Sequence, residues 1–150
     1  MLNFAAQLKE ASMRKIFEYY AWNADAAAAL LRIGFGGFMF YHGFVKFINF
    51  NETWLYFPDP IGLGKQFSLS LVIFAEFLCG LMVAVGLLTR LSILPIGVTM
   101  FVAFFFIHAA DPFETKELSL VFLLLSVVVF FFGSGKYSVD NIIFSKHYNN

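Results

Sequence analysis

Three ionisable side chains lie inside stretches of sequence that are otherwise mostly apolar, and these groups are the best placed to carry out chemistry. Glu76 is the one carboxylate in the apolar run 67–88, and His42 and Lys46 lie four residues apart in the apolar run 26–48. A carboxylate in hydrocarbon is costly unless it is protonated, paired or in contact with a wet cavity. We therefore expect Glu76 to pair with His42 or Lys46.

Two further groups, His108 and Glu117, flank an acidic turn that follows the third apolar run. At a rise of about 1.5 Å per helical residue, they fall in the same half of a helical bundle as His42, Lys46 and Glu76. These five side chains predict a ligand-binding or proton-relay site. In it, His42 and Glu76 would accept or pass protons, Lys46 would hold an anionic oxygen, and His108 with Glu117 would gate the site.

The sequence also permits a structural interpretation of the same residues. A pair between Glu76 and Lys46 or His42 could simply hold two helices together, since interhelical polar contacts in membranes contribute only about 0.6 to 2 kcal/mol. Arg32, Arg90 and Asp140 form a second polar level, for which we expect a structural role. Arg32 could reach the nearer membrane surface or pair with Asp140, and Arg90 could anchor the end of the second helix to lipid phosphates.

Metal and cofactor chemistry has weaker support in the sequence. His42 and His108 could ligate one haem iron, but His108 lies close to a turn, and lone histidines mostly make ordinary hydrogen bonds. His108, Glu114 and Glu117 are spaced as zinc ligands could be, although a solvated acidic turn is the commoner explanation. We therefore expect no metal, disfavour haem, and find neither a nucleophile–base pair nor a nucleotide-binding loop that would indicate an independent enzyme.

The elements that position these groups are membrane helices. The chain is 60% hydrophobic and 13% charged, whereas charged residues make up about a quarter of a soluble domain. Apolar runs of about 20 residues cross the hydrocarbon. The sequence predicts an all-α integral membrane four-helix bundle, and we place its helices at about 26–48, 67–88, 91–110 and 117–133. A short amphipathic interfacial helix over 1–25 precedes them, residues 49–66 form an interfacial loop, and 143–150 are a C-terminal tail.

Helical phase predicts which residues share a face with these groups. The side of Glu76 also carries Cys79, Gly80, Val83, Gly86 and Arg90, and that of His108 carries Gly97, Phe101, Phe104 and Phe105. The pocket that follows is lined by Phe and Gly, with convergent polar groups at one end. Such a pocket suits a flat, largely apolar ligand with a polar head, such as a quinone.

Basic residues in the connections predict the orientation in the membrane. One side carries Lys9, Arg14, Lys15, Arg90, Lys136 and Lys146, and the other carries Lys46, Lys65 and Lys116. The richer side faces the cytoplasm by this rule, so we expect both termini inside. The net charge is zero, which disfavours nucleic acid as a partner and leaves membrane lipid, other membrane subunits or further copies of the chain.

A set of short motifs in a fixed order resembles the DoxX family of small bacterial membrane proteins. The motifs are Arg32, His42-Gly43-x-x-Lys46, Phe74-Ala75-Glu76, Gly86-Leu87-x-Thr89-Arg90, His108, Asp111-Pro112-Phe113, Glu117 and Gly135-x-x-Ser138-x-Asp140. The resemblance covers about residues 26–142. It implies a four-helix protein of the inner membrane linked to redox metabolism, since named relatives are subunits of a thiosulfate:quinone oxidoreductase and of a quinol oxidase complex.

Residues and resemblance together give one leading functional hypothesis and two alternatives. The leading one is a small subunit of a redox or respiratory assembly that offers a quinone-like ligand or protons a polar site in the outer leaflet. Such a chain would be an accessory subunit of an oxidoreductase complex. The alternatives are a scaffolding membrane subunit without a cofactor and a small-molecule carrier.

Overall fold

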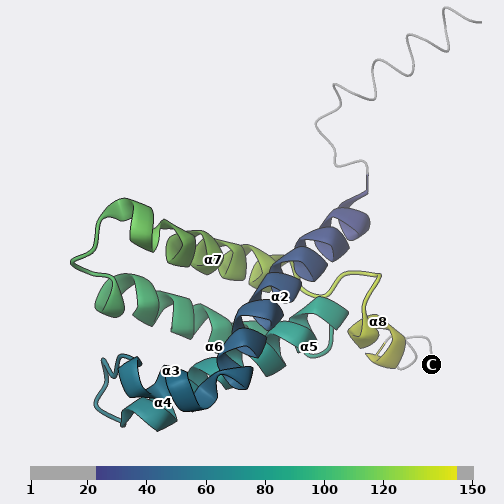
Figure 1. Ribbon diagram of the computed structural model, residues 1–150. Helices are drawn as coiled ribbons and strands as arrows, with labels where there is room; N and C mark the ends of the chain where they lie inside the picture. Colours follow the sequence, from purple (N-terminus) through teal and green to yellow (C-terminus); the bar gives the residue numbers. More distant parts are fainter. Residues whose placement is uncertain (1–22, 145–150) are drawn as a thin grey trace, which may run out of the picture.

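The computed structural model describes residues 23–144, and these residues form helices and turns without a strand. Four helical segments are long and apolar enough to cross a membrane: Ala24–Ile48, Lys65–Val85, Thr89–Ile107 and Phe113–Phe132. They pack side by side as a bundle (Figure 1). The predicted all-α membrane bundle is confirmed. The predicted interfacial helix and C-terminal tail lie almost wholly outside the described residues.

The helices are interrupted at two places by π-helical turns. In chain order the elements are α2 (Ala24–Ile48), α3 (Phe50–Tyr56), α4 (Lys65–Ile73), η1 (Phe74–Cys79), α5 (Gly80–Val85), α6 (Thr89–Val102), η2 (Ala103–Ile107), α7 (Phe113–Phe132) and α8 (Val139–Phe144). The second span is therefore α4, η1 and α5 in succession, and the third is α6 followed by η2. A π-helical turn holds more residues than an α-helical turn, and such turns are frequent at functional sites.

The observed helix ends differ from the predicted ones where turn chemistry decides them. Asn23 caps α2, because its side-chain oxygen accepts a hydrogen bond from the Ala26 amide at 2.9 Å. The second span ends at Val85, where Gly86 has a left-handed backbone (φ 78°) and Leu88 follows with φ 47°. Arg90 therefore lies in the first turn of α6, and the prediction that Thr89 and Arg90 form the turn between the second and third helices is wrong.

The segment expected as a loop contains the short helix α3. The chain leaves α2 at Asn49, whose side-chain amide donates to the Val45 carbonyl at 2.9 Å. The Asn49 carbonyl then accepts the Thr53 hydroxyl at 2.8 Å in the first turn of α3. One residue thus ends α2 and starts α3, a local exchange of hydrogen bonds that hydropathy does not reveal.

Glycine contacts bring α2 against the second span. A β-carbon on Gly36 would lie 2.5 Å from the Ala84 nitrogen, and one on Gly43 would lie 2.2 Å from the Phe77 nitrogen. On the facing helix, a β-carbon on Gly80 would lie 2.7 Å from the Phe40 nitrogen. The two backbones approach so closely because these residues have no side chain. This crossing fixes the relative position of α2 and η1.

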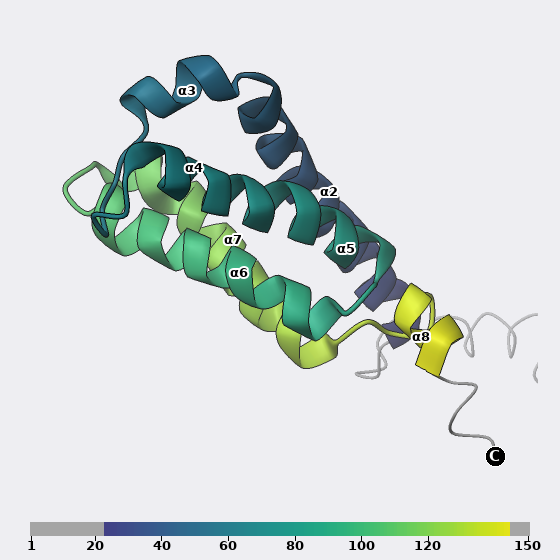
Figure 2. The same cartoon turned by 90° about the horizontal axis from the view of Figure 1, so that it is seen from below.

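The third and fourth spans complete the bundle. The helix α6 packs against α7, and η1 and α5 contact α6. The buried cluster that joins them contains Phe35, Met39, Cys79, Val83, Ile93, Ile96, Met100, Phe122 and Val129. The turns 57–64 and 108–112 lie at one end of the bundle with α3, whereas α8 lies at the other end beside the turn 86–88 (Figure 2). We call these the α3 end and the α8 end.

Candidate functional site

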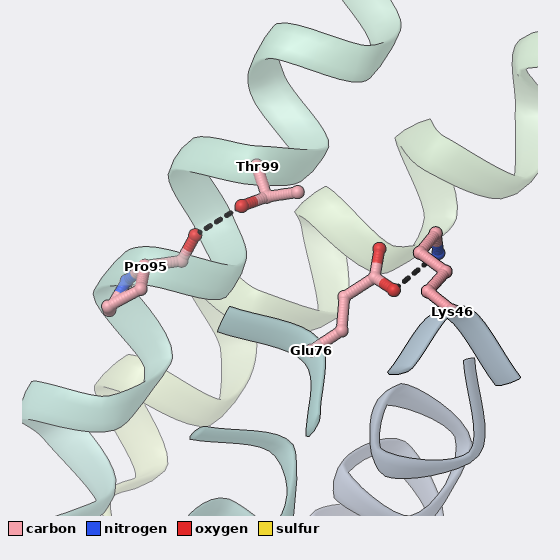
Figure 3. A network of polar contacts seen from close by, with 4 residues as sticks. All are labelled: Lys46, Glu76, Pro95 and Thr99. Atoms are coloured by element: carbon pink, nitrogen blue, oxygen red, sulfur yellow. Dashed lines mark hydrogen bonds and ion pairs between the residues drawn. The ribbon is translucent and has the colours of Figure 1, made fainter. Parts of the chain in front are cut away.

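The Glu76 carboxylate forms an ion pair with the Lys46 ammonium group (Figure 3). Glu76 lies in η1 and is 4% exposed, while the Lys46 side chain, near the end of α2, is 27% exposed. Gly43 contacts the main chain of η1 less than one helical turn before Lys46, so the same close approach that joins the helices delivers the cation to the acid. Of the two partners that the sequence allowed for Glu76, the structure shows Lys46.

A cavity of about 510 Å³ lies beside this ion pair. Residues of α2, α4 and η1 line it on one side, and residues of α6, η2 and α7 line it on the other. Its polar lining consists of His42, Lys46, Ser68, Glu76, Thr99, His108 and Ser119, and the rest is mostly aliphatic. The Thr99 hydroxyl donates to the Pro95 carbonyl at 2.9 Å, within α6 (Figure 3). Four of the five predicted site residues, His42, Lys46, Glu76 and His108, therefore line one cavity although they come from the first span, the second span and the turn after the third.

His42 contributes a free imidazole to this cavity. Its ring meets the Phe122 ring edge-on, with the centroids 6.0 Å apart. No residue in the described part of the chain forms a hydrogen bond with its ring nitrogens. A ligand in the cavity can therefore use His42 as a hydrogen-bond donor or acceptor.

His108 has a partner that the sequence analysis did not assign. Its Nδ1 lies 2.7 Å from a carboxylate oxygen of Asp111, in the turn between η2 and α7. The Nε2 atom is then the nitrogen left for a ligand in the cavity. Glu117, which we expected to act with His108, is exposed and lies outside the cavity lining. The clue was the spacing of three residues between His108 and Asp111, which one tight turn can bridge.

The expected lining of Phe and Gly is wrong. Phe57 and Phe122 are the phenylalanines that line the cavity, whereas Phe101 and Phe105 are exposed on the outer surface of the bundle. The physical reason is η2, because the additional residue of a π turn rotates the helix face by about 100°. His108 follows η2, so the helix face that contains His108 is not the face that contains Phe101 before this π turn.

The turn 57–64 lines the cavity at the α3 end and is held together by Asp59. The carboxylate of Asp59 accepts the Ser68 hydroxyl at 2.8 Å and the amides of Gly64 and Leu63 at 2.8 and 3.0 Å. The hydrogen bond from Ser68, followed by those from the backbone, lowers the pKa of Asp59 below its ordinary value. This turn carries Phe57 and Ile61 into the lining, a contribution that we did not expect from the interfacial loop 49–66.

Comparison with protein families gives one match, to the DoxX family model, over residues 27–109. That match spans more than half of the chain. The chain belongs to the DoxX family. DoxX proteins are membrane proteins often linked to redox metabolism, and with four membrane-length helices this chain is a multi-pass membrane protein. Searches among curated proteins and among solved structures found no match.

At the α8 end of this DoxX protein, Arg32 is 1% exposed and binds main-chain carbonyls. Its guanidinium donates to Val83 and Ala84 at 3.1 and 2.8 Å, at the end of α5, and to Tyr137 at 2.6 Å. Its guanidinium is thus used within the protein, and no ion pair joins it to Asp140 within residues 23–144. Arg32 instead fastens the segment before α8 to the end of α5.

Asp140 and Arg90 occupy the same end of the DoxX chain. The Asp140 carboxylate accepts the amides of Leu88 and Thr89 at 2.7 and 3.2 Å, where α6 begins. A carboxylate is favourable at this position because the helix dipole is positive there. Arg90 is exposed and lies against the turn at Gly133. No group of three potential metal-ligating side chains occurs among residues 23–144, and Glu114 and Glu117 are both exposed.

Proposed function

We propose that this DoxX protein is an accessory subunit of a membrane redox assembly, with a cavity at the α3 end that binds a quinone-like ligand. The observation that carries the proposal is the cavity of about 510 Å³, which has a mostly apolar lining and gathers four ionisable side chains from two spans and the turn after the third. Sites for small organic ligands have this composition, with a few polar groups that orient an otherwise apolar molecule.

The polar groups suit the carbonyl oxygens of a quinone head. Lys46 can stabilise an oxygen that becomes negative on reduction, and the Glu76 carboxylate beside it can accept a proton and pass it to the ligand. His42 has no hydrogen-bond partner within the described residues, and His108 is held by Asp111 with Nε2 available. Reduction of a quinone to a quinol consumes as many protons as electrons. The protons would pass through these side chains, and the electrons would come from a redox cofactor in a partner subunit.

The cavity has a route to the hydrocarbon that such a ligand needs. Leu71, Val98 and Leu118 line the cavity and are 42%, 63% and 51% exposed, so an accessible apolar surface borders the cavity. Lipid chains cover that surface in a membrane protein. A quinone dissolved in the bilayer can therefore enter sideways between the spans, with its tail remaining among lipid chains.

The orientation of the chain is part of the proposal. The excess of Lys and Arg at the termini, in the first turn of α6 and after α7 supports a cytoplasmic α8 end, so the cavity faces the outer leaflet of a bacterial inner membrane. Cysteine labelling at positions 52 and 114 tests this directly. Both positions should react with an impermeant reagent from outside, and labelling only from inside overturns the orientation.

Quinone binding by the purified protein tests the central part of the proposal. The lipid extract of the protein should contain quinone, and a short-chain quinone should bind with an affinity that falls at least tenfold in His42→Phe. Glu117→Gln is the matched control, because Glu117 lies outside the cavity, and its affinity should equal that of the parent protein. Absence of quinone from the extract together with no binding would favour the scaffold hypothesis, and a Soret band would favour haem.

A further inference from the structure

A second hollow, at the α8 end, contains basic side chains that the proposed quinone site does not use. It measures about 790 Å³ and lies where the first turn of α6, the turn after α7 and α8 meet. Arg90 and Lys136 both line it. Neither side chain has a hydrogen bond or an ion pair with any residue of the described part of the chain, so both cations are available to a ligand.

The acidic residues in the same hollow are already engaged. Asp140 accepts the amides of Leu88 and Thr89 at 2.7 and 3.2 Å. Asp25 accepts the main-chain amide of Lys136 at 3.2 Å. Asp140 in addition donates its own amide to the Gly86 carbonyl, next to the buried guanidinium of Arg32. The two carboxylates are thus used in hydrogen bonds within the protein. The side chains of Arg90 and Lys136, which have no such partner among residues 23–144, indicate that the hollow binds a ligand from outside.

The turn at Gly133 adds hydrogen-bond donors for an anion. Gly133 has φ 73°, and a β-carbon there would lie 3.4 Å from the Nε atom of Arg90. The turn therefore passes directly beneath the guanidinium. The amides of Ser134 and Gly135 have no hydrogen-bond partner among residues 23–144, and both residues line the hollow.

A polar group in the wall of the hollow also lacks a partner. Thr89 lines the hollow and is 1% exposed, and its Oγ1 has no hydrogen-bond partner within the described residues. Thr89 is the first residue of α6, where the helix dipole favours negative charge. A second anionic group beside Asp140 would need basic side chains to offset the repulsion. Arg90 and Lys136 are placed to do this.

We propose that the α8-end hollow binds the phosphate group of an anionic membrane lipid between Arg90, Lys136 and the amides of Ser134 and Gly135. An arginine and unpaired amides are the groups that proteins use for phosphate oxygens. A lipid is the favoured source because the hollow lies at the end of two membrane spans and Phe132 and Leu91, both exposed, belong to its rim. The acyl chains can lie along these apolar residues while the phosphate occupies the hollow.

Lipid titration of the purified protein in a neutral detergent tests the proposal. Phosphatidylglycerol should bind and raise the melting temperature, and phosphatidylcholine should do so far less. The double variant Arg90→Gln with Lys136→Gln should lose about thirtyfold in affinity for phosphatidylglycerol, because each basic residue near an anionic lipid contributes about a factor of five. It should melt at the parent temperature without lipid, since neither side chain has a partner to lose among residues 23–144.

The matched control removes the same charge from the other end of the bundle. Lys65→Gln with Lys116→Gln should keep the parent affinity for phosphatidylglycerol. Equal affinity in the Arg90/Lys136 variant and the parent protein, or equal loss in both double variants, overturns the site. Displacement of the lipid by millimolar inorganic phosphate also overturns the proposal, because the ligand would then be a soluble phosphate. If the double variant does not fold, each single variant should still show about a fivefold loss.

Discussion

Gly43 lies against the main chain of Glu76, so that a β-carbon on residue 43 would come within 2.7 Å of the Glu76 carbonyl carbon. This contact sets the distance between α2 and η1, and Lys46 extends from the next part of α2 to the Glu76 carboxylate. The ion pair at the cavity therefore depends on a glycine that carries no functional group. Helix packing and site chemistry are coupled at this position.

Alanine at position 43 should separate the two helices and weaken the protein. A methyl group has no room there, and overpacking of this kind costs about 1 to 3 kcal/mol. We expect Gly43→Ala to lower the melting temperature in detergent by several degrees. Gly37→Ala is the control, because a β-carbon on Gly37 meets no atom within 4 Å. If both variants melt like the parent protein, the close contact at Gly43 does not hold the helices together.

The ion pair should behave as a coupled unit. Glu76→Gln leaves the Lys46 ammonium without its counter-charge and should destabilise the protein by about 1 to 3 kcal/mol, less than for a fully buried pair because Lys46 is partly exposed. The further change Lys46→Met should restore part of this loss. Unfolding free energies of the single and double variants give the coupling energy, for which we expect at least about 0.5 kcal/mol. Strictly additive effects would show that the two side chains act independently.

The Asp59 turn should depend on pH in the acidic range only. Because the folded-state pKa of Asp59 is lowered, its stabilising effect is complete above the unfolded pKa of about 3.9 and is lost as the pH falls through the folded value. Hydrogen exchange at Leu63 and Gly64 should therefore be slower in the parent protein than in Asp59→Asn between about pH 5 and 7. Comparison at the same pH cancels the intrinsic exchange rate.

The difference in hydrogen-exchange rate between the parent protein and Asp59→Asn should be constant from about pH 5 to 7 and shrink below about pH 4. Ser68→Ala is a second check, since the Ser68 hydroxyl contributes most to the lowered pKa of Asp59. Without this hydrogen bond the pKa of Asp59 is lowered less, so the Ser68→Ala variant should lose the slow exchange at a higher pH than the parent protein. A difference that changes steadily between pH 5 and 7 would mean that another group holds the turn.

Arg32 should stabilise the α8 end more than any exposed basic residue does. Its guanidinium satisfies three carbonyls, two in α5 and one in the segment before α8, and is 1% exposed. A hydrogen bond from a charged donor contributes about 1.5 to 3 kcal/mol. Arg32→Met should lower the unfolding free energy by about 3 kcal/mol and speed hydrogen exchange in α8. In neutral detergent without anionic lipid, Arg90→Gln, which removes an exposed arginine nearby, should leave both unchanged. Unaltered exchange of α8 in Arg32→Met would contradict the proposed fastening.

Much of the fold was predictable because hydrocarbon imposes simple rules. Runs of apolar residues fixed the number of spans, and Glu76 was recognisable because an acid there needs a partner. Counting residues from the end of each predicted helix placed Glu76 at a depth in the membrane close to that of Lys46 and His42. All three side chains line the same cavity in the structure.

What could not be predicted depended on backbone geometry that leaves little trace in hydropathy. The π turn η2 shifted the helix phase and removed Phe101 and Phe105 from the cavity. The left-handed residues Gly86 and Leu88 put the turn before Thr89, so Arg90, predicted in the connection between the second and third helices, lies in the third span. The partner of His108 was Asp111, because a tight turn brings the two together while Glu117 lies on the outer surface of α7.

Infrared difference spectroscopy tests most directly whether the cavity couples a quinone to Glu76. Spectra recorded with and without a short-chain quinone should show a change in a carboxyl or carboxylate band, because a ligand beside Lys46 alters the environment of the paired acid. The band should be missing in Glu76→Gln and present in Glu117→Gln. A spectrum in which quinone changes no carboxyl band, or in which the band persists in Glu76→Gln, would contradict the account.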